Sequence, residues 1–397
     1  MKSKGLGLSY LILLCCFVFL SRSTAQDGPA KNRSKPFSFP LQLEMRVPFG
    51  PTAFPNGSNF YLIYELYLTN FGASPIHLKR MELLNGDRSG NAPFLSFDSL
   101  ELKTMVKILG NNNLKEALNI EAGQSAVVYI EAKTSNKTGF PNNIIHRIIT
   151  SADSLDGAAI NTHTTKIQTL KPPVSGSDWI AADGPGNSID NHHRRGNIIL
   201  GGHTINSRRF AIDWKKVKDR VSFSGDAANV RSYFCYGEKI FAVADGTIIS
   251  ATDGLPDNIP GHGKAFNPAV PLTFEKLPGN NIVIDLGDGH YAHYMHMQPG
   301  SLHVKKGDRV RKGQLLGNIG NSGDAREPHL HFEVTTSAKL LDGEGIPYII
   351  DHYRLGYQNG FDEVHHNELP KEKQIVDFGN ARESNQERLL SLTIHLR

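Results

Sequence analysis

Short apolar runs separated by turn-forming residues occupy the chain from residue 37 to residue 170. Runs rich in aromatic and β-branched residues and bounded by Gly, Asn or Pro are typical of β-strands. The runs that meet this description are Phe60–Leu68, Ile76–Leu84, Ser125–Ala132 and Ile144–Thr150. Several strands at this spacing indicate a β-sandwich. We therefore expect residues 37–170 to form an immunoglobulin-like sandwich, which acts as a binding or spacer module because potential ligands do not cluster in it.

The pattern changes in the second half of the chain, where glycine becomes frequent and tight turns join the apolar runs. The run Asn281–Leu286 leads into Gly287-Asp-Gly289 and returns through His290–Met297, which predicts a β-hairpin. The segment Val304–Gly317 predicts another strand–turn–strand unit, and its paired glycines resemble those of the half-barrels of biotinyl and lipoyl carrier domains. We therefore expect an all-β chain whose second domain, residues 179–355, consists of β-sheet and half-barrel.

Two segments of different composition flank this second domain. Residues 171–178 carry Pro172 and Pro173 followed by Ser and Gly, a composition typical of a stiffened linker. Residues 356–397 are polar, rich in Asn and Glu, and contain a final apolar stretch at Leu389–Leu396. This C-terminal tail is either an edge strand that returns to a domain or a partly disordered segment.

The first 25 residues predict an export signal. Lys2 and Lys4 precede the apolar run Leu6–Leu20, and small residues up to Ala25 precede a cleavage point. A run of about 15 apolar residues is shorter than the ~20 needed to span a bilayer, and no second run in the chain approaches that length. We therefore expect cleavage near Ala25 and a mature protein without a stable membrane span.

Composition narrows the class of protein further. A length of 397 residues with 39% hydrophobic and 21% charged residues is typical of a folded chain of two domains. Three cysteines are present, and removal of the signal leaves only Cys235, which excludes a disulfide-stapled scaffold. The signal carries three cations and no acid, so its removal lowers the net charge from +4 to +1. A near-neutral balance argues against a nucleic-acid partner.

Seventeen histidines are present, and the most informative stretch is Pro328–Val334. Side chains alternate between the two faces of a β-strand, so His329 and His331 share one face while Leu330 and Phe332 share the other. Two imidazoles about 6–7 Å apart along a strand suit one metal ligand and one catalytic partner. Taken alone, they equally fit two surface histidines.

Two further segments carry candidate groups. The same alternation places His296 on one face with Tyr294. In the segment from Arg209 to Trp214, Phe210 and Ile212 would face a core and Asp213 would face the opposite side. An acid in so apolar a strand is either a partnered structural residue or a metal ligand.

Six segments, taken in order, resemble the lysostaphin/LytM-type zinc metallopeptidases, which cut the peptide bridges of peptidoglycan. The resemblance covers about residues 190–335. Its parts are Phe210–Trp214, Gly237–Gly246, Tyr294–His296, Gly307–Gln314, Gly320–Gly323 and Pro328–Phe332. By position, the resemblance implies that Asp213 and His331 are Zn²⁺ ligands. It also implies that His296 and His329 form the catalytic pair.

The residue types agree with this chemistry. A catalytic zinc takes three nitrogen or oxygen ligands and keeps one position for water, whose pKa falls to about 7. One imidazole can take a proton from that water and pass it to the leaving amine, and a second can orient the water or stabilise the oxyanion. Thiolate ligands are not required, in agreement with a mature chain that keeps one cysteine.

The sequence departs from the family at the first zinc ligand, which is usually a histidine four residues before the aspartate. Arg209 occupies that position, and a guanidinium cannot be deprotonated to bind a metal. Two histidines could replace it: His193 lies 20 residues before Asp213, and His203 lies 10 residues before it.

Hairpin pairing separates the two candidates. A turn at residues 201–202 would place residues 190–196 beside residues 207–213, so His193 would lie near Asp213 whereas the other histidine would lie at the turn. We therefore favour His193 as the first ligand, with His203 as the alternative and loss of the metal as a third possibility. The neighbouring arginines form either a solvated surface or a site for acidic groups of a cell-wall substrate; they are Arg194, Arg195, Arg208 and Arg209.

Three functions are consistent with these features. The first is an exported zinc metalloendopeptidase of the bacterial cell envelope, secreted or periplasmic, which hydrolyses peptidoglycan cross-bridges or a similar peptide. The second is a catalytically inert LytM-like protein that binds cell wall or regulates another hydrolase. The third is a structural or carbohydrate-binding β-protein. The four site groups that the resemblance implies favour the enzyme, because an inert domain has no chemical need for all of them, whereas Arg209 favours the inert protein.

Overall fold

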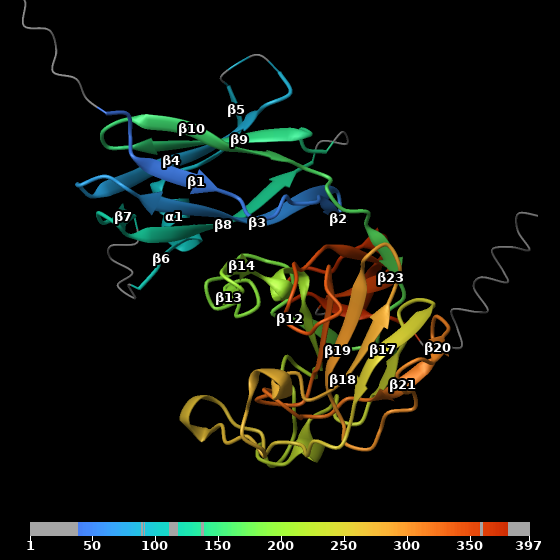
Figure 1. The fold of residues 1–397 in the computed structure, drawn as a ribbon. Coiled ribbons are helices and arrows are strands. Elements are labelled where there is room, and N and C mark those ends of the chain that lie inside the picture. The colour runs from blue at the N-terminus through green and yellow to red at the C-terminus, as the bar shows by residue number, and fades with distance from the viewer. Residues whose placement is uncertain are drawn as a thin grey trace, which may run out of the picture. The chain divides into compact units, whose positions relative to one another are not determined.

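The computed structural model describes residues 39–88, 90, 92–110, 118–135, 139–357 and 360–379. The expected export signal, residues 1–25, and the apolar stretch Leu389–Leu396 lie outside the described residues. Strands form most of the regular structure in the described part of the chain (Figure 1), which confirms the expected all-β class. Within that same part, no helix combines the length and the apolar character that crossing a bilayer requires.

The first sheet is antiparallel and contains five strands in the order β1-β3-β8-β6, with β2 paired to β3. Its strands are β1 (Leu43–Arg46), β2 (Phe54–Asn56), β3 (Asn59–Asn70), β6 (Val106–Ile108) and β8 (Ser125–Thr134). The long strands β3 and β8 pair from Phe60↔Thr134 to Thr69↔Ser125. The predicted strands Phe60–Leu68 and Ser125–Ala132 lie within them.

The second sheet also has five strands, in the order β10-β9-β4-β5, with β7 paired to β4. Its strands are β4 (Ile76–Asn85), β5 (Pro93–Phe97), β7 (Asn119–Ile120), β9 (Asn143–Thr150) and β10 (Ser154–Asn161), and helix α1 (Ser99–Met105) follows β5. Both sheets contribute to one apolar core, which contains Leu62 of β3 and Met81 of β4. The immunoglobulin-like strand arrangement remains a prediction for these two sheets.

Residues beyond 167 form a larger sheet of eleven strands. Its order is β11-β23-β25-β12-β15-β22-β19-β18-β17-β20, with β24 paired to β23. Its strands are β11 (Gln168–Leu170), β12 (Trp179–Ala182), β15 (Ile212–Lys216), β17 (Gly246–Thr252), β18 (Asn280–Asp285), β19 (Tyr291–Met297), β20 (Arg309–Val310), β22 (Leu330–Thr335), β23 (Tyr348–Tyr357), β24 (Gly360–Glu368) and β25 (Ile375–Asp377). The hairpin expected around residues 287–289 is formed by β18 and β19. The segment expected to be a polar tail, residues 356–397, supplies β24 and β25 to this sheet.

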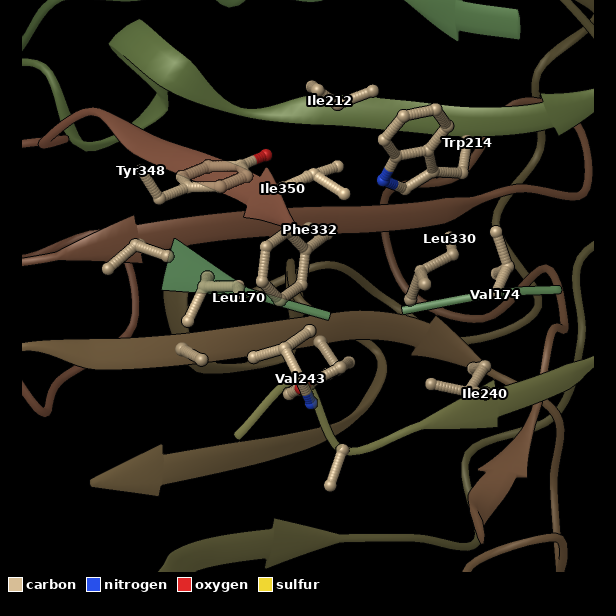
Figure 2. Close-up of a cluster of buried hydrophobic side chains, with 14 of the residues drawn as sticks. Leu170, Val174, Ile212, Trp214, Ile240, Val243, Leu330, Phe332, Tyr348 and Ile350 are labelled. Carbon is tan, nitrogen blue, oxygen red and sulfur yellow. The ribbon is translucent and has the colours of Figure 1, made fainter. Parts of the chain in front are cut away.

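Alternating side chains of this large sheet build a second apolar core (Figure 2). Ile212 and Trp214 of β15 point into it, and Phe332 of β22 points into it from the next strand. Because side chains alternate along a strand, the residues next to these positions face the opposite side of the sheet. On β15 that residue is Asp213, and on β22 it is His331. The apolar pattern therefore places both groups on one face.

Strand β3 is buried on both of its faces. Leu62 and Tyr64 face the core between the two five-stranded sheets. Ile63 belongs to the core of the large sheet, and Glu65 is only 3% exposed. A strand covered on both sides requires a nearly continuous apolar run rather than an alternating one, and Phe60–Leu68 has such a run except at Glu65.

Two short ribbons complete the described strands: β13 (Ile198–Leu200) with β14 (His203–Ile205), and β16 (Lys239–Phe241) with β21 (Leu315–Asn318). Gly201 and Gly202 form the turn of the first ribbon, as expected. The pairing expected between residues 190–196 and 207–213 is wrong, because Ser207–Phe210 forms the 3-10 helix η2 and the following strand pairs with β12 and β22 instead. Among the described residues, the other 3-10 helices are η3 (Val230–Ser232), η4 (Gly263–Ala265) and η5 (Phe274–Lys276).

Gly313 and Gly323 offer a matched test of backbone packing, since their φ angles are +83° and +73°. A Cβ atom at Gly323 would lie 2.3 Å from the backbone nitrogen of Gly279, whereas one at Gly313 would meet nothing within 4 Å. Gly313→Ala should therefore lower the free energy of unfolding by about 1–2 kcal/mol, the penalty of a left-handed alanine. Gly323→Ala should lower it further. Equal losses in urea unfolding titrations would contradict the close packing at Gly323.

Candidate metal centre and active site

The register of three adjacent strands places the first site groups side by side. Asp213 of β15 is the cross-strand partner of His331 of β22, which is in turn the partner of Met295 of β19. Directly opposed residues of an antiparallel pair have Cβ atoms about 4.5–5.5 Å apart on the same face. Asp213 and His331 are 3% and 4% exposed. The carboxylate and the imidazole therefore meet in a nearly dry environment.

Two carboxylates hold the ring of His331. Its Nδ1 lies 2.9 Å from Asp213 Oδ1, and its Nε2 lies 3.3 Å from Glu333 Oε2. Burial alone would lower the pKa of this ring, but the hydrogen bonds to the two acids outweigh burial and raise it to about 9. Glu333 follows two residues later on the same strand, so strand alternation itself supplies the second carboxylate.

His193 reaches Asp213 from the loop between β12 and β13. Its Nε2 lies 3.3 Å from Asp213 Oδ1. This atom is buried and has no hydrogen-bond partner among the described residues. The Nδ1–H donates to the backbone oxygen of Asp183 over 2.8 Å, so Nε2 keeps a lone pair directed at the site. The alternative, His203, is exposed on β14. The structure thus brings His193, and not His203, to the carboxylate.

His329 and His296 complete the group. Their Nδ1 atoms lie 2.7 Å from the backbone oxygen of Glu327 and 2.8 Å from that of Ser322, respectively. Each Nδ1–H therefore donates to a carbonyl, which leaves each Nε2 with a lone pair. His329 Nε2 lies 3.4 Å from Asp213 Oδ1, and the centroids of the His296 and His329 rings are 4.8 Å apart. All four predicted site histidines thus lie around one aspartate.

The position of His296 differs from the alternation expected along its strand. Strict alternation groups it with Tyr294, whose ring lies in the apolar core against Phe332. His296 instead has a φ of +63°, which few residues with a side chain adopt. Its ring centroid lies 6.0 Å from that of His331. The left-handed backbone at the end of β19 therefore turns the imidazole away from the core and into the site.

Burial and mutual proximity set the charges in the site. Burial would raise the pKa of Asp213, but the adjacent rings of His329 and His193 hold it well below its usual range. Burial lowers the pKa of His193 to about 4 and also lowers the pKa of His296 and of His329. The site therefore presents an anionic carboxylate surrounded mainly by neutral imidazoles.

This donor set fits a divalent cation. Three imidazole nitrogens lie 2.9–3.4 Å from one oxygen of Asp213. Imidazole and carboxylate are ligands that zinc takes in catalytic sites, and a hydrogen bond to the outer ring nitrogen orients such ligands. A cation among these groups would also account for the buried, unpartnered Nε2 of His193. The residues that could hold it are His193, Asp213 and His331.

His192 belongs to the same group but is absent from the site residues that the sequence predicts. Its ring centroid lies 4.2 Å from that of His193. Its Nδ1 lies 3.2 Å from Asp183 Oδ1, and its Nε2 lies 3.9 Å from Asp213 Oδ2. Ligand atoms of His192, His193 and Asp213 lie within 4.8 Å of one another, so His192 is a further candidate ligand. The histidine doublet is a visible signal, but adjacency does not show that both rings approach one carboxylate.

The arginines near the site do not form a solvated surface. Arg194 and Arg209 are 1% and 5% exposed, and both pair with Glu65 of β3. Arg209 therefore stands at the usual ligand position as an ion-pair partner. Of the four arginines considered from the sequence, Arg208 is the one that lines the pocket of the site, where it donates to the backbone oxygen of Gly196 over 3.1 Å.

The pocket over these groups has a volume of about 680 Å³. Its lining includes the site histidines and Asp213, the apolar side chains of Phe274 and Leu277, and the cationic side chains of Arg208 and Lys215. A pocket that combines apolar walls with a few convergent polar groups is typical of a ligand-binding site. Together with a bound cation, it could place a polarised carbonyl beside imidazoles that accept protons.

Two solved structures overlap with part of the chain. The catalytic domain of lysostaphin from Staphylococcus simulans aligns with 30% of this chain and 80% of its own, with 26% identity and a TM-score of 0.17. The M23 metalloprotease pseudoalterin, from the deep sea, aligns with 52% of this chain and 95% of its own, with 17% identity and a TM-score of 0.28.

Sequence comparison gives the more direct assignment. Peptidoglycan DD-endopeptidase ShyA of Vibrio cholerae is 41% identical over 104 residues, which are 26% of this chain and 23% of that protein. Glycyl-glycine endopeptidase ALE-1 of Staphylococcus capitis is 43% identical over 61 residues, which are 15% of this chain and 16% of that protein. The chain thus spans less than a quarter of the length of either relative. Residues 231–343 match the family model described as Peptidase family M23, and the chain therefore carries an M23 peptidase domain.

Proposed function

We propose that this chain is an exported zinc metalloendopeptidase that hydrolyses peptide bonds, most directly the cross-bridges of peptidoglycan. The observation that carries the proposal is the convergence of three imidazole nitrogens on one buried oxygen of Asp213. The M23 domain supports the reaction class. The relatives named as peptidoglycan DD-endopeptidase and glycyl-glycine endopeptidase support the substrate class.

In this proposal His193, Asp213 and His331 hold Zn²⁺. Bound there, the metal would polarise the scissile carbonyl and lower the pKa of a water molecule. The chain prepares two of the ligands by hydrogen bonds on their far sides. The backbone oxygen of Asp183 accepts from Nδ1 of His193, and Glu333 faces Nε2 of His331. The nitrogen that faces Asp213 is therefore a different one in each ring.

His296 and His329 form the catalytic pair. Each donates its Nδ1–H to a backbone carbonyl, so each Nε2 can accept a proton in the pocket and return it to the leaving amine. One ring serves as the base, and the other orients the water or stabilises the developing oxyanion. The left-handed backbone of His296 supports this role, because a residue on the regular strand would place its ring in the apolar core.

The pocket offers a peptide both apolar and charged contacts. Phe274 and Leu277 supply the apolar contact, and the charged lining is mixed, since Lys215 pairs with Glu327 and Arg208 lies in the same wall. A peptidoglycan substrate implies that the protein acts outside the cytoplasm, in the secreted or periplasmic part of a bacterial cell envelope. The expected export signal at residues 1–25 agrees with that location and remains a prediction.

One observation favours a second function, a catalytically inert LytM-like protein that binds cell wall or regulates another hydrolase. Arg209 stands where the family usually has its first metal ligand. The approach of His193 to Asp213 weighs against this second function, because it restores a third ligand from another segment. Metal content and cleavage distinguish the two functions.

The purified chain is expected to bind one Zn²⁺ per molecule and to cleave peptidoglycan-derived peptides. His331→Ala removes a nitrogen ligand, so bound zinc and cleavage should both be lost. His303→Ala changes an exposed histidine of the same half of the chain and should leave both unchanged. Elemental analysis and mass spectrometry of the digested peptides measure the two properties. A native chain without stoichiometric zinc would contradict the enzyme and favour the inert protein.

The first ligand can be tested with a pair of histidine variants. His193→Ala removes a proposed ligand whose Nε2 lies beside the Asp213 carboxylate. Zinc affinity should therefore fall by at least the about 10–100-fold that is typical when a residue hydrogen-bonded to a metal ligand is lost. His203→Ala should bind zinc as the native chain does, because this side chain is exposed on β14. Competition with a chromophoric chelator measures both affinities. Weaker binding in the second variant alone would reverse the assignment.

Glu333 is expected to tune the metal ligand that it faces. Glu333→Gln keeps the size of the side chain but removes the charge beside His331 Nε2, so zinc affinity should fall about 10–100-fold. The fold should persist, since one oxygen of this buried carboxylate has no hydrogen-bond partner among the described residues and its charge is costly to bury. Chelator competition and circular dichroism check the two expectations. Unchanged affinity would show that the contact does not orient the ring.

A further inference from the structure

Glu65 is a buried acid in an otherwise apolar strand. It lies on the face of β3 that points away from the core of the two five-stranded sheets, and it is 3% exposed. A carboxylate in such a place requires charged or hydrogen-bonding partners. Burial would raise its pKa, but the guanidinium groups of Arg209 and Arg194 outweigh burial and lower it. Glu65 is therefore an anion held by two cations.

The first of these cations directly follows the proposed metal ligand His193. Arg194 pairs with Glu65 through Nη1. Its Nη2 donates to the backbone oxygens of Tyr64, over 2.6 Å, and Ile130, over 3.1 Å. One side chain thus contacts both central strands of the first sheet, β3 and β8. Three fixed acceptors leave a planar guanidinium little freedom to rotate.

The second cation is Arg209, which pairs with Glu65 and with a second glutamate, Glu344. Arg209 donates from Nη2 to Glu65 Oε2 over 2.7 Å and to Glu344 Oε2 over 2.6 Å. Its Nη1 donates to the backbone oxygen of Gly345 over 3.0 Å. Two arginines and two glutamates thus form a neutral cluster. Such a cluster is stable while complete, whereas the loss of one member leaves an uncompensated buried charge.

The rest of the loop that carries His193 is attached to the same sheet. Asn187 donates to the backbone oxygen of Tyr129 over 2.8 Å, and its own side-chain oxygen accepts from Arg194 Nε over 3.2 Å. Arg195 lies over the ring of Tyr129 with its guanidinium carbon 4.1 Å from the centroid. The chain is therefore fixed to β8 before His193 and fixed to β3 and β8 immediately after it.

We propose that the first β-sheet positions the metal ligand His193, with Glu65 and Arg194 as positioning residues. This role rests on the proposed zinc site. The family that the sequence resembles usually carries its first ligand four residues before the aspartate, and in this chain that position is Arg209 of the 3-10 helix η2. Here the proposed ligand His193 comes from a loop. Arg209 donates hydrogen bonds to Glu65 and cannot bind the metal. The contacts of Asn187, Arg194 and Arg195 with β3 and β8 thus hold the loop that carries the proposed ligand.

The test compares Glu65→Gln with a matched control in the full chain, using Co²⁺ as the metal probe. Glu65→Gln removes the charge that Arg194 and Arg209 share, so Co²⁺ affinity should fall about 10–100-fold. The visible absorption of bound Co²⁺ should also change, because it reports the arrangement of ligands. Glu82→Gln removes another buried carboxylate of the two five-stranded sheets, one that pairs with Arg80 and Arg147. It should lower the thermal midpoint but keep the native affinity and spectrum.

Arg194→Lys provides a second variant that keeps the charge. A lysine can still pair with Glu65 but cannot reach the two backbone oxygens as well, so the affinity should lie between those of native protein and Glu65→Gln. If Glu65→Gln does not fold, the Co²⁺ affinity and spectrum of Arg194→Lys test the positioning role instead. Native affinity and spectrum in the folded variants would overturn the positioning role while the zinc site stands. A native chain that binds no Co²⁺ or Zn²⁺ would overturn the proposed function and, with it, the positioning role.

Discussion

The antiparallel pairing of β15 with β22 is the constraint on which the site depends. Ile212 is the partner of Phe332, and Asp213 is the partner of His331. Packing of the first pair into the apolar core obliges the second pair to face the pocket. A shift of one residue in either strand would exchange its faces and bury a charged or polar group among hydrocarbon. The stability of the core and the position of the site therefore require the same strand register.

The site histidines are held from the side that does not face Asp213. Three of them donate Nδ1–H to backbone carbonyls, of Asp183, Ser322 and Glu327. Backbone oxygens cannot rotate away, and buried rings cannot exchange these bonds for water. The tautomer and the orientation of each ring are thus set before any ligand arrives, which is the preorganisation that metal binding and proton transfer require.

Arg209 stands at the position of the resembled family's usual first ligand, and its side chain forms buried ion pairs with Glu65 and Glu344. A histidine there would need space and a lone pair facing Asp213, whereas the guanidinium points to Glu65 and Glu344. His193 comes from the preceding loop, which contacts β3 and β8 of the first sheet. The apolar run of β3 is nearly continuous because this strand is covered on both faces. The one acid in the run, Glu65, faces the two arginines.

The sequence by itself determined the all-β class, the principal strands and the placement of Asp213 opposite an apolar face, because alternation and turn residues are local properties of the chain. It also favoured His193 over His203, but through a hairpin pairing that does not form. Only the tertiary structure decided the remaining features. The left-handed backbone of His296 at the end of β19 and the approach of His192 from the loop between β12 and β13 depend on packing between segments distant in the sequence. The burial of Arg194 depends on a carboxylate 129 residues away in the sequence, and no local pattern encodes a charge pair at that distance.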